Sequence, residues 1–97
     1  QTMVQNNDGA KKILISELGW YAGTAPLAVT EDAQAVYLTR AYNILYSLEF
    51  VEGFYWYHLK DHTSTPQPAD PELNYGLYRW DATERPAATS FRNLALP

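Results

Sequence analysis

The stretch Lys12-Ile13-Leu14-Ile15-Ser16-Glu17-Leu18-Gly19-Trp20 decides the fold that we predict for this chain. Its continuous apolar run is rich in β-branched side chains and too short for a helix, which is typical of a parallel strand buried on both faces. We therefore predict a strand over residues 12–18, ended by Gly19 and the turn-forming segment 22–26. Glu17 comes at the carboxyl end of this strand, where α/β sheets and barrels carry their sites.

A helix and a second strand are expected next. Thr30 offers a hydroxyl N-cap, and the acids Glu31 and Asp32 suit the first turn of a helix. Apolar residues then recur at spacings of three and four, which predicts one buried stripe on a helix of about five turns. A second strand, rich in aromatic residues, is predicted over residues 51–57, and the order strand, helix, strand indicates a right-handed βαβ unit with parallel strands. The predicted stripe comprises Ala33, Tyr37, Ala41, Ile44, Leu45 and Leu48, with Gln34, Thr39, Arg40 and Asn43 largely on the opposite side.

The C-terminal part of the chain combines a long loop with a last helix. Residues 60–74 contain three prolines and several small polar residues, which predicts a long loop of the kind that is usually functional or mobile. Residues 75–80 are expected to add a short extended piece. Arg85-Pro86 then begins a helix with proline at its first position, and its apolar face comprises Ala87, Ala88, Phe91 and Leu94. We find no internal repeat or domain boundary, so residues 1–97 are expected to form a single α/β unit.

Composition and charge exclude several classes of function. The formal net charge is −4 and Lys and Arg number only seven, which argues against nucleic acid and anionic membrane as partners. Cysteine is absent, so we expect no disulfide framework, no thiolate metal site and no cysteine nucleophile. No apolar stretch approaches the roughly 20 residues of a membrane span. The polar residues 1–12 lack the pattern of a signal peptide, which leaves the location open, secretion of a larger parent protein included.

Two features of the sequence, its aromatic clusters and Glu17, are candidates for a functional site. The chain has eight Tyr and three Trp, several of them in the clusters Trp20-Tyr21 and Tyr55-Trp56-Tyr57. Such rings serve as amphipathic core filling, which composition alone favours, or as platforms for the C–H faces of sugar rings. Glu17 is open to two interpretations of equal weight. A carboxylate buried without partners is costly and therefore indicates a use, whereas an exposed Glu just past a strand needs none.

Four segments resemble the C-terminal part of clan A (β/α)8-barrel glycoside hydrolases, and families 5 and 39 are the most similar. Residues 12–20 resemble the seventh strand of these barrels, which ends in Ser or Thr, Glu, an aromatic or apolar residue, and Gly. Residues 53–61 resemble the eighth strand, which ends in a Trp below the bound sugar. Residues 75–78, followed by Arg85-Pro86-Ala87, are similar to the segment that leads into the final helix. With residues 1–7 as the end of the sixth helix, the resemblance implies a partial (β/α)8 TIM barrel, a βαβα quarter of the whole.

The resemblance also implies which residues form the site. Carried over position by position, Glu17 is the nucleophile and Trp56 the platform for the sugar, with Trp20, His58 and Asp61 as further substrate contacts. Retaining glycosidases need two carboxyls about 5–5.5 Å apart, one that attacks the anomeric carbon and one that protonates the leaving oxygen. No cofactor is implied.

The general acid of these enzymes is missing from the sequence. It comes from an Asn-Glu pair at the end of the fourth barrel strand, and no Asn-Glu pair occurs here. No motif sets one of the remaining glutamates opposite Glu17, so turnover by the chain alone is not expected. A metal site is also not expected, because His58 and His62 have no cysteine and no clear third ligand. The glutamates that no motif sets opposite Glu17 are Glu49, Glu52, Glu72 and Glu84.

The chain is shorter than a complete barrel, which predicts that it associates with other chains. A complete barrel needs about 250 residues, and this chain has 97. Two strands of the buried type leave both sheet edges unpaired and both faces uncovered. We therefore expect self-association into a homo-oligomer, or assembly with the missing N-terminal portion of a barrel, with carbohydrate as the ligand. The alternative is a self-associating, non-catalytic remnant that binds carbohydrate or has a structural role. The sugar and the linkage depend on loops outside this sequence.

Overall fold

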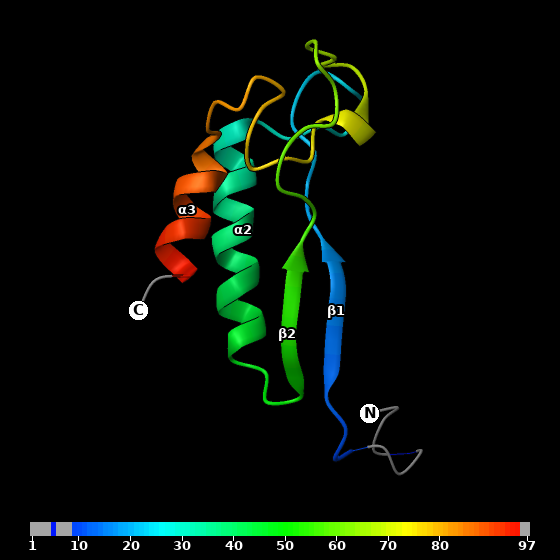
Figure 1. Ribbon diagram of the computed structural model, residues 1–97. Coiled ribbons are helices and arrows are strands. Elements are labelled where there is room, and N and C mark those ends of the chain that lie inside the picture. The colour runs from blue at the N-terminus through cyan, green and yellow to red at the C-terminus, as the bar shows by residue number, and fades with distance from the viewer. Residues whose placement is uncertain (1–4, 6–8, 96–97) are drawn as a thin grey trace.

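The computed structural model describes residue 5 and residues 9–95 and has the strand, helix, strand, helix order expected from the sequence. Its elements are strand β1 (Ile13–Leu18), helix α2 (Glu31–Tyr46), strand β2 (Val51–Trp56), the 3-10 turn η1 (Pro71–Leu73) and helix α3 (Pro86–Ala95) (Figure 1). Both strands begin and end within one residue of their predicted bounds. The expected end of a sixth helix in residues 1–7 lies outside the described residues, apart from Gln5.

The two strands form a parallel pair, as predicted. Ile13 is opposite Val51, Ile15 is opposite Phe54 and Leu18 is opposite Trp56, with two irregularities of register in between. Beyond β2, the amide of Tyr57 donates to the Leu18 carbonyl at 2.8 Å and extends the pairing by one residue. Both arrows point to the end of the molecule where the loops gather (Figure 1), so the carboxyl ends of the strands face these loops.

Helix α2 begins as the sequence predicts but buries a different face. The Thr30 hydroxyl accepts from the Ala33 amide at 3.0 Å and caps the helix. The predicted stripe is met only in part, since its members are half-buried except for Ile44, which is 60% exposed, and the fully buried residues are Gln34, Ala35 and Leu38. The reason is that α2 packs much more extensively against α3 than against β2, which rotates its buried face toward the second helix. The helix also ends at Tyr46, before the stripe's last predicted member, Leu48.

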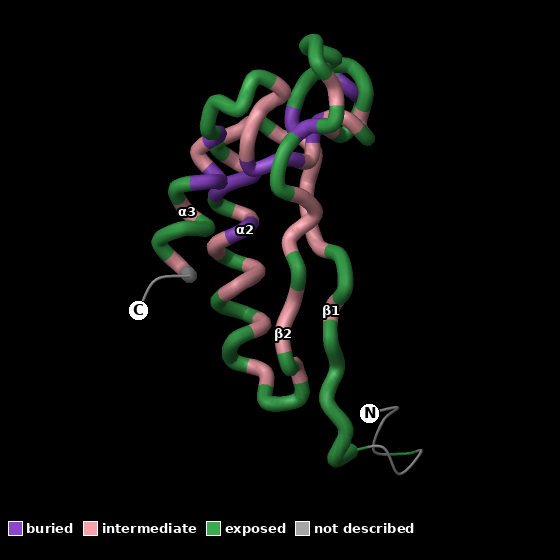
Figure 2. The backbone as a smooth tube through the Cα atoms, in the orientation of Figure 1, coloured by how far each residue is buried: buried purple, intermediate pink, exposed green. Residues whose placement is uncertain are grey.

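The core lies at the loop end of the molecule. It consists of Ala35 and Leu38 of α2, Leu77 of the loop, and Ala87 and Ala88 at the start of α3. Figure 2 shows these buried segments gathered where α2, α3 and the loops meet. The predicted helix start at Pro86 is confirmed, although Phe91, expected on its apolar face, is exposed.

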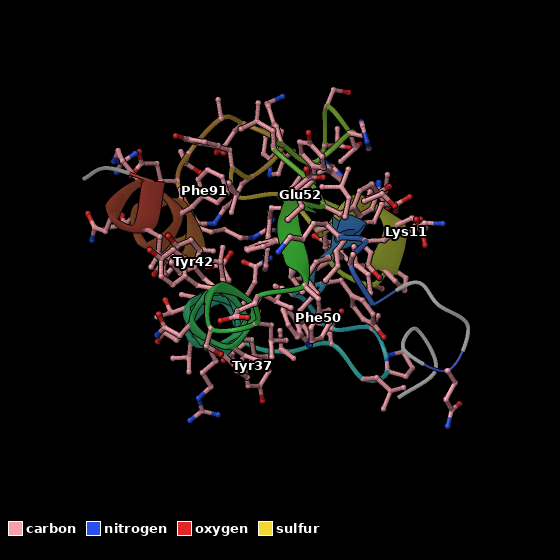
Figure 3. All side chains as sticks on the ribbon, turned by 90° about the horizontal axis from the view of Figure 1, so that it is seen from below. Lys11, Tyr37, Tyr42, Phe50, Glu52 and Phe91 are labelled. Atoms are coloured by element: carbon pink, nitrogen blue, oxygen red, sulfur yellow. The ribbon has the colours of Figure 1, made fainter. Side chains whose placement is uncertain are left out.

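The strands are poorly covered in the single chain. Ile13, Leu14 and Tyr55 are 37%, 51% and 63% exposed, so the two-faced burial predicted for these strands is not met within this chain. Seen from below, α2 and α3 lie to one side of the β1–β2 pair (Figure 3). Among the described helices, none has the length and apolar character required to cross a bilayer.

Candidate functional site

Glu17 lines an open pocket at the carboxyl ends of the strands. The side chain is exposed and shares a cavity of about 280 Å³ with residues from three segments of the chain. One segment is the end of β1, the second follows β2 directly, and the third is η1 with the residue just after it. The lining residues are Glu17, Leu18, Gly19, Tyr57, Glu72 and Tyr75. The pocket thus combines two carboxylates with two phenols.

Close backbone approach shapes the wall of the pocket. A Cβ atom on Gly19 would lie 2.2 Å from the Tyr57 carbonyl oxygen, so only glycine allows the backbone after β1 to approach Tyr57 this closely. The Tyr75 ring then lies 5.2 Å from the Tyr57 ring and 5.5 Å from the Tyr21 ring. Burial is the main cause that raises the pKa of Tyr75, and the charge of Glu72 adds to it. Tyr75 therefore keeps its phenolic proton as a hydrogen-bond donor at neutral pH.

The turn that carries Glu72 is anchored to the rest of the fold. The Asp70 carboxylate accepts from the Glu72 amide at 3.0 Å. Asn74, only 7% exposed, donates through its side chain to the carbonyls of Gln67 and Asp70, both at 2.6 Å. The Asn74 carbonyl accepts from the Ala22 amide at 3.1 Å. These bonds tie η1 to the segment after β1, which holds Glu72 on the same side as Glu17.

The tryptophans expected to hold sugar lie elsewhere. Trp56 is partly buried and packs against the core cluster formed by the helices and Leu77. The Trp20 ring lies 5.9 Å from that of Trp56 and 5.4 Å from that of Tyr37 on α2. Neither tryptophan lines the pocket that contains Glu17. The structure therefore brings Glu17 together with Tyr57, a member of the aromatic cluster 55–57 that the resemblance did not place among the site residues.

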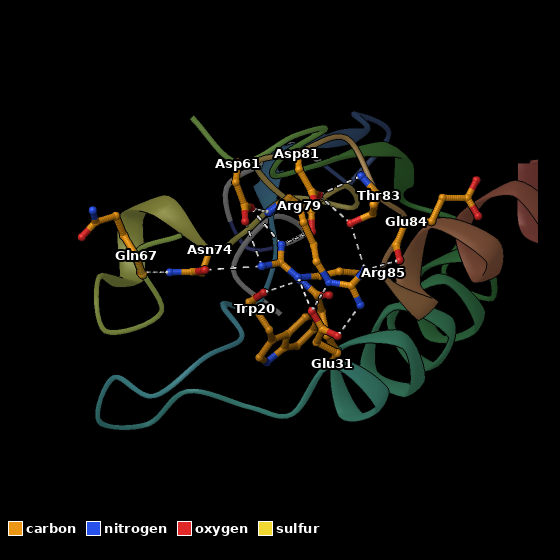
Figure 4. Close-up of polar contacts among 12 residues, drawn as sticks. Trp20, Glu31, Asp61, Gln67, Asn74, Arg79, Asp81, Thr83, Glu84 and Arg85 are labelled. Atoms are coloured by element: carbon orange, nitrogen blue, oxygen red, sulfur yellow. Dashed lines mark hydrogen bonds and ion pairs between the residues drawn. The ribbon is translucent and has the colours of Figure 1, made fainter. Parts of the chain in front are cut away.

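Asp61 forms a buried ion pair with Arg85. Its side chain is 3% exposed, and its two oxygens accept from Nη1 and Nη2 of Arg85, both at 2.8 Å (Figure 4). The Gly76 amide also donates to Asp61 at 2.9 Å, and the Gly76 carbonyl accepts from Arg85 at 2.8 Å. A Cβ on Gly76 would lie 2.6 Å from Asp61 atoms. This paired carboxylate fixes the loop after β2 to the start of α3.

Glu31 completes the network around Arg85. It accepts from Nη2 and Nε of Arg79 at 2.7 and 2.9 Å, and from Nε of Arg85 at 2.9 Å (Figure 4). The hydrogen bond from Arg79 is the main cause that lowers the Glu31 pKa, opposed by burial and assisted by Arg85. The network therefore joins the N-termini of α2 and α3. Our sequence interpretation missed it because Arg85 was taken only as the residue before a helix-starting proline.

His58 lies beside the pocket rather than in its lining. Its ring is 4.5 Å from that of Tyr57 and 4.3 Å from that of His62. Burial, with the charge of His62 as the next cause, lowers the pKa of His58, so the ring is neutral at pH 7. Within the described residues, no group of three or more His, Cys, Asp or Glu side chains is arranged to hold a metal ion.

Comparisons with known proteins give a consistent fold. No protein-family model and no curated sequence matches this chain. Among solved structures, β-glucuronidase from Ruminococcus gnavus in complex with uronic deoxynojirimycin matches 96% of the chain with a TM-score of 0.70 and 20% identity. A complex of the same enzyme with D-glucuronic acid gives the same values. GH5_18 from Streptomyces cattleya in complex with Manb1-4GlcNAc matches 86% of the chain with a TM-score of 0.66 and 18% identity.

The chain has the fold of one segment of a glycoside hydrolase barrel. It spans 17% of the length of the R. gnavus chain and 19% of the S. cattleya chain. The predicted fold class, an α/β partial (β/α)8 barrel, is confirmed, and so is the resemblance at the level of the fold. In this barrel segment β1 and β2 are neighbouring parallel strands, and the pocket with Glu17 opens at their carboxyl ends, the end at which such barrels carry their active sites.

Proposed function

We propose that this barrel segment descends from a retaining glycoside hydrolase and carries the nucleophile side of its site, with Glu17 as the nucleophile and Tyr57 as the sugar platform. The observation that supports this most directly is the pocket of about 280 Å³ that Glu17 shares with Tyr57 and Tyr75. An exposed carboxylate can attack an anomeric carbon, and a neighbouring aromatic face can pack on the ring that carries it.

Glu17 alone does not complete the reaction. After attack, the leaving oxygen must receive a proton, and a positioned general acid is typically worth about 10²–10⁴-fold in rate. The motif that supplies this acid is missing from the sequence, so the chain by itself should not hydrolyse unactivated oligosaccharides. Robust hydrolysis of such substrates that disappears in Glu17→Gln would contradict this part of the proposal, because a second carboxyl would then act as the acid.

Sugar binding is the property that tests the proposal. In amide-resolved NMR of the full chain, a neutral methyl glycoside should shift the signals of Gly19, Tyr57 and Tyr75. We expect weak affinity, because a pocket open on one side buries less of a ligand than a closed site does. Tyr57→Ala should remove the shifts, whereas Glu17→Gln should keep them and serves as the matched control. Shifts confined to Trp20 and Trp56, or no shifts up to the solubility limit, would refute the proposed site.

A second candidate function is supported by a different surface. A groove of about 500 Å³ runs between the end of α2 and the start of β2 and is lined mainly by apolar side chains. Together with the exposed strand residues, it favours a self-associating, non-catalytic unit, or one that docks with the N-terminal portion of a barrel. The groove is lined by Tyr42, Leu45, Tyr46, Leu48, Glu49, Val51, Glu52, Gly53 and Phe54.

A further inference from the structure

We propose that Glu72 selects ligands by charge, so that the pocket accepts neutral or amino sugars and rejects uronic acids. This inference rests on the proposed function, since it assumes that sugars enter the Glu17 pocket. Glu72 comes from the loop after β2, whereas Glu17 comes from β1, and both carboxylates line one cavity of about 280 Å³. Within the described part of the chain, the lining contains no Lys or Arg.

The position of Glu72 is set by the fold and not by a free loop. Its amide is held by Asp70 at 3.0 Å, and Asn74, two residues on, is buried and bonded to three backbone groups around the turn. The Arg85 guanidinium also reaches the Asn74 side-chain oxygen at 3.4 Å. The charge of Glu72 contributes to the raised pKa of Tyr75, which supports the view that its field reaches the pocket wall.

The two arginines of the buried network, Arg79 and Arg85, are engaged with other acids. Arg85 forms its ion pairs with Asp61 and Glu31, and Arg79 pairs with Glu31. The guanidinium groups of Arg79 and Arg85 therefore point at the carboxylates of Glu31 and Asp61 (Figure 4). A ligand that enters the pocket therefore meets two negative charges from Glu17 and Glu72.

Charge should then decide among ligands of the same ring shape. A carboxylate on the sugar is repelled by both glutamates, an ammonium group is attracted, and a neutral hydroxyl can donate a hydrogen bond to either carboxylate. Because the pocket is open to solvent, we expect a preference of about tenfold, equivalent to about 1.4 kcal/mol. The preference should shrink as salt is added, since exposed charges are screened. The R. gnavus enzyme, which is seen with D-glucuronic acid, provides the contrasting ligand chemistry.

The test compares methyl β-D-glucoside with two relatives, each of which differs from it at a single carbon. Methyl β-D-glucoside, methyl β-D-glucuronide and the 2-amino-2-deoxy glucoside are titrated into the full chain and followed by the amide signals of Gly19, Tyr57 and Tyr75. We expect the glucoside and the amino sugar to bind at least about tenfold more tightly than the glucuronide. Glu72→Gln keeps the size of the side chain and should narrow this gap several-fold. Glu52→Gln removes an equal charge near the amino end of β2, outside the pocket lining, and should leave the gap unchanged.

The outcomes separate this inference from the proposed function. Equal binding of all three glycosides, or a gap that Glu72→Gln does not change, overturns charge selection while the sugar site stands. Binding of none of them overturns the sugar site, and charge selection falls with it. Thermal melts of both variants establish that they are folded, and Glu72→Lys provides the stronger variant, for which the order of affinity should invert.

Discussion

Replacement of Arg85 should destabilise the fold more than any other single change of charge in the described residues. The Arg85 side chain is 5% exposed and the carboxylate of Asp61 is 3% exposed, with two contacts of 2.8 Å between them. Arg85→Met keeps much of the apolar stem but leaves Asp61 as a buried charge without its partner. The Gly76 carbonyl and one oxygen of Glu31 lose a donor in the same step.

The expected loss is about 3–5 kcal/mol, the usual result when one partner of a buried ion pair is removed. A domain of this size has a total stability of about 5–15 kcal/mol, so the loss is a large fraction of it. With a urea m-value of about 1–3 kcal/mol per M, the unfolding midpoint should fall by at least about 1 M. Asp61→Asn should cost less, because Arg85 keeps the charge of Glu31 as a partner.

Urea unfolding followed by tryptophan fluorescence provides the measurement. The double variant, Asp61→Asn with Arg85→Met, should be less destabilised than the sum of the two single variants, since the uncompensated charge is gone. Arg92→Met is the matched control: its pair with Glu84 is 47% and 44% exposed, and the midpoint should hardly move. An Arg85→Met loss below about 1 kcal/mol, or simple additivity in the double variant, would refute the view that this pair fixes the loop to α3.

Three further predictions concern the aromatics, the acid range and the assembly. Trp56→Ala should lower stability by up to about 3–5 kcal/mol because the ring packs on the core, whereas Tyr57→Ala should leave the melt nearly unchanged and weaken sugar binding. The Glu31 pKa lies below its ordinary value of 4.5, so its pairing stabilises the fold above pH 4.5 and is lost as the pH falls through the lower folded value; Glu31→Gln should flatten the acid side of the stability curve. We expect a homo-oligomer by light scattering, dissociated or unfolded by Phe54→Glu, and a monodisperse wild-type monomer of 11.0 kDa with a cooperative melt would contradict this.

The parts of the fold that the sequence predicts well depend on local physics. The short run Ile13-Leu14-Ile15 is rich in β-branched residues and is soon ended by Gly19, which favours a strand over a helix, and β1 lies where it was expected. Thr30 before two acids, and proline after Arg85, mark helix starts through capping and a fixed φ angle. These signals act within a few residues of the element that they define, so no knowledge of the tertiary structure is needed.

The buried face of α2 could not be predicted in the same way. Apolar spacing is satisfied by more than one face of this helix, and the choice between them depends on what lies against it. Gln34 is fully buried although it is polar, since its amide donates to the Trp20 carbonyl at 3.0 Å. Ile44 is 60% exposed because it lies on the side of the helix opposite Ala35, which packs in the core with the start of α3. Both facts follow from what packs against each side of α2 in the folded chain, which leaves no local trace in the sequence.

The site shows the same limit at the scale of one residue. β2 ends at Trp56, and the side chains of Trp56 and Tyr57 leave the backbone toward different surroundings. Strand alternation would allow either residue to face Glu17, and the irregular register between β1 and β2 removes the means to choose. Asp61 and Arg85 are separated by 24 residues, so their pairing depends on the path of the long loop. Of the site residues that the sequence pattern indicated, only Glu17 lines the pocket, and the other lining side chains come from the way the loops fold over the strand ends.

The uneven burial of the chain explains how a pocket can persist while the strands lack cover. The buried segments gather at the loop end of the molecule (Figure 2). The Asp61–Arg85 pair and buried Asn74 also belong to the loops and not to the strands. The exposed Ile13 and Leu14 lie at the opposite end of β1, near the apolar groove beside β2. A second copy or another barrel portion would therefore stabilise the amino ends of the strands without having to assemble the pocket. All residues that line the Glu17 pocket belong to this chain, so the proposed sugar binding can be tested on the chain alone.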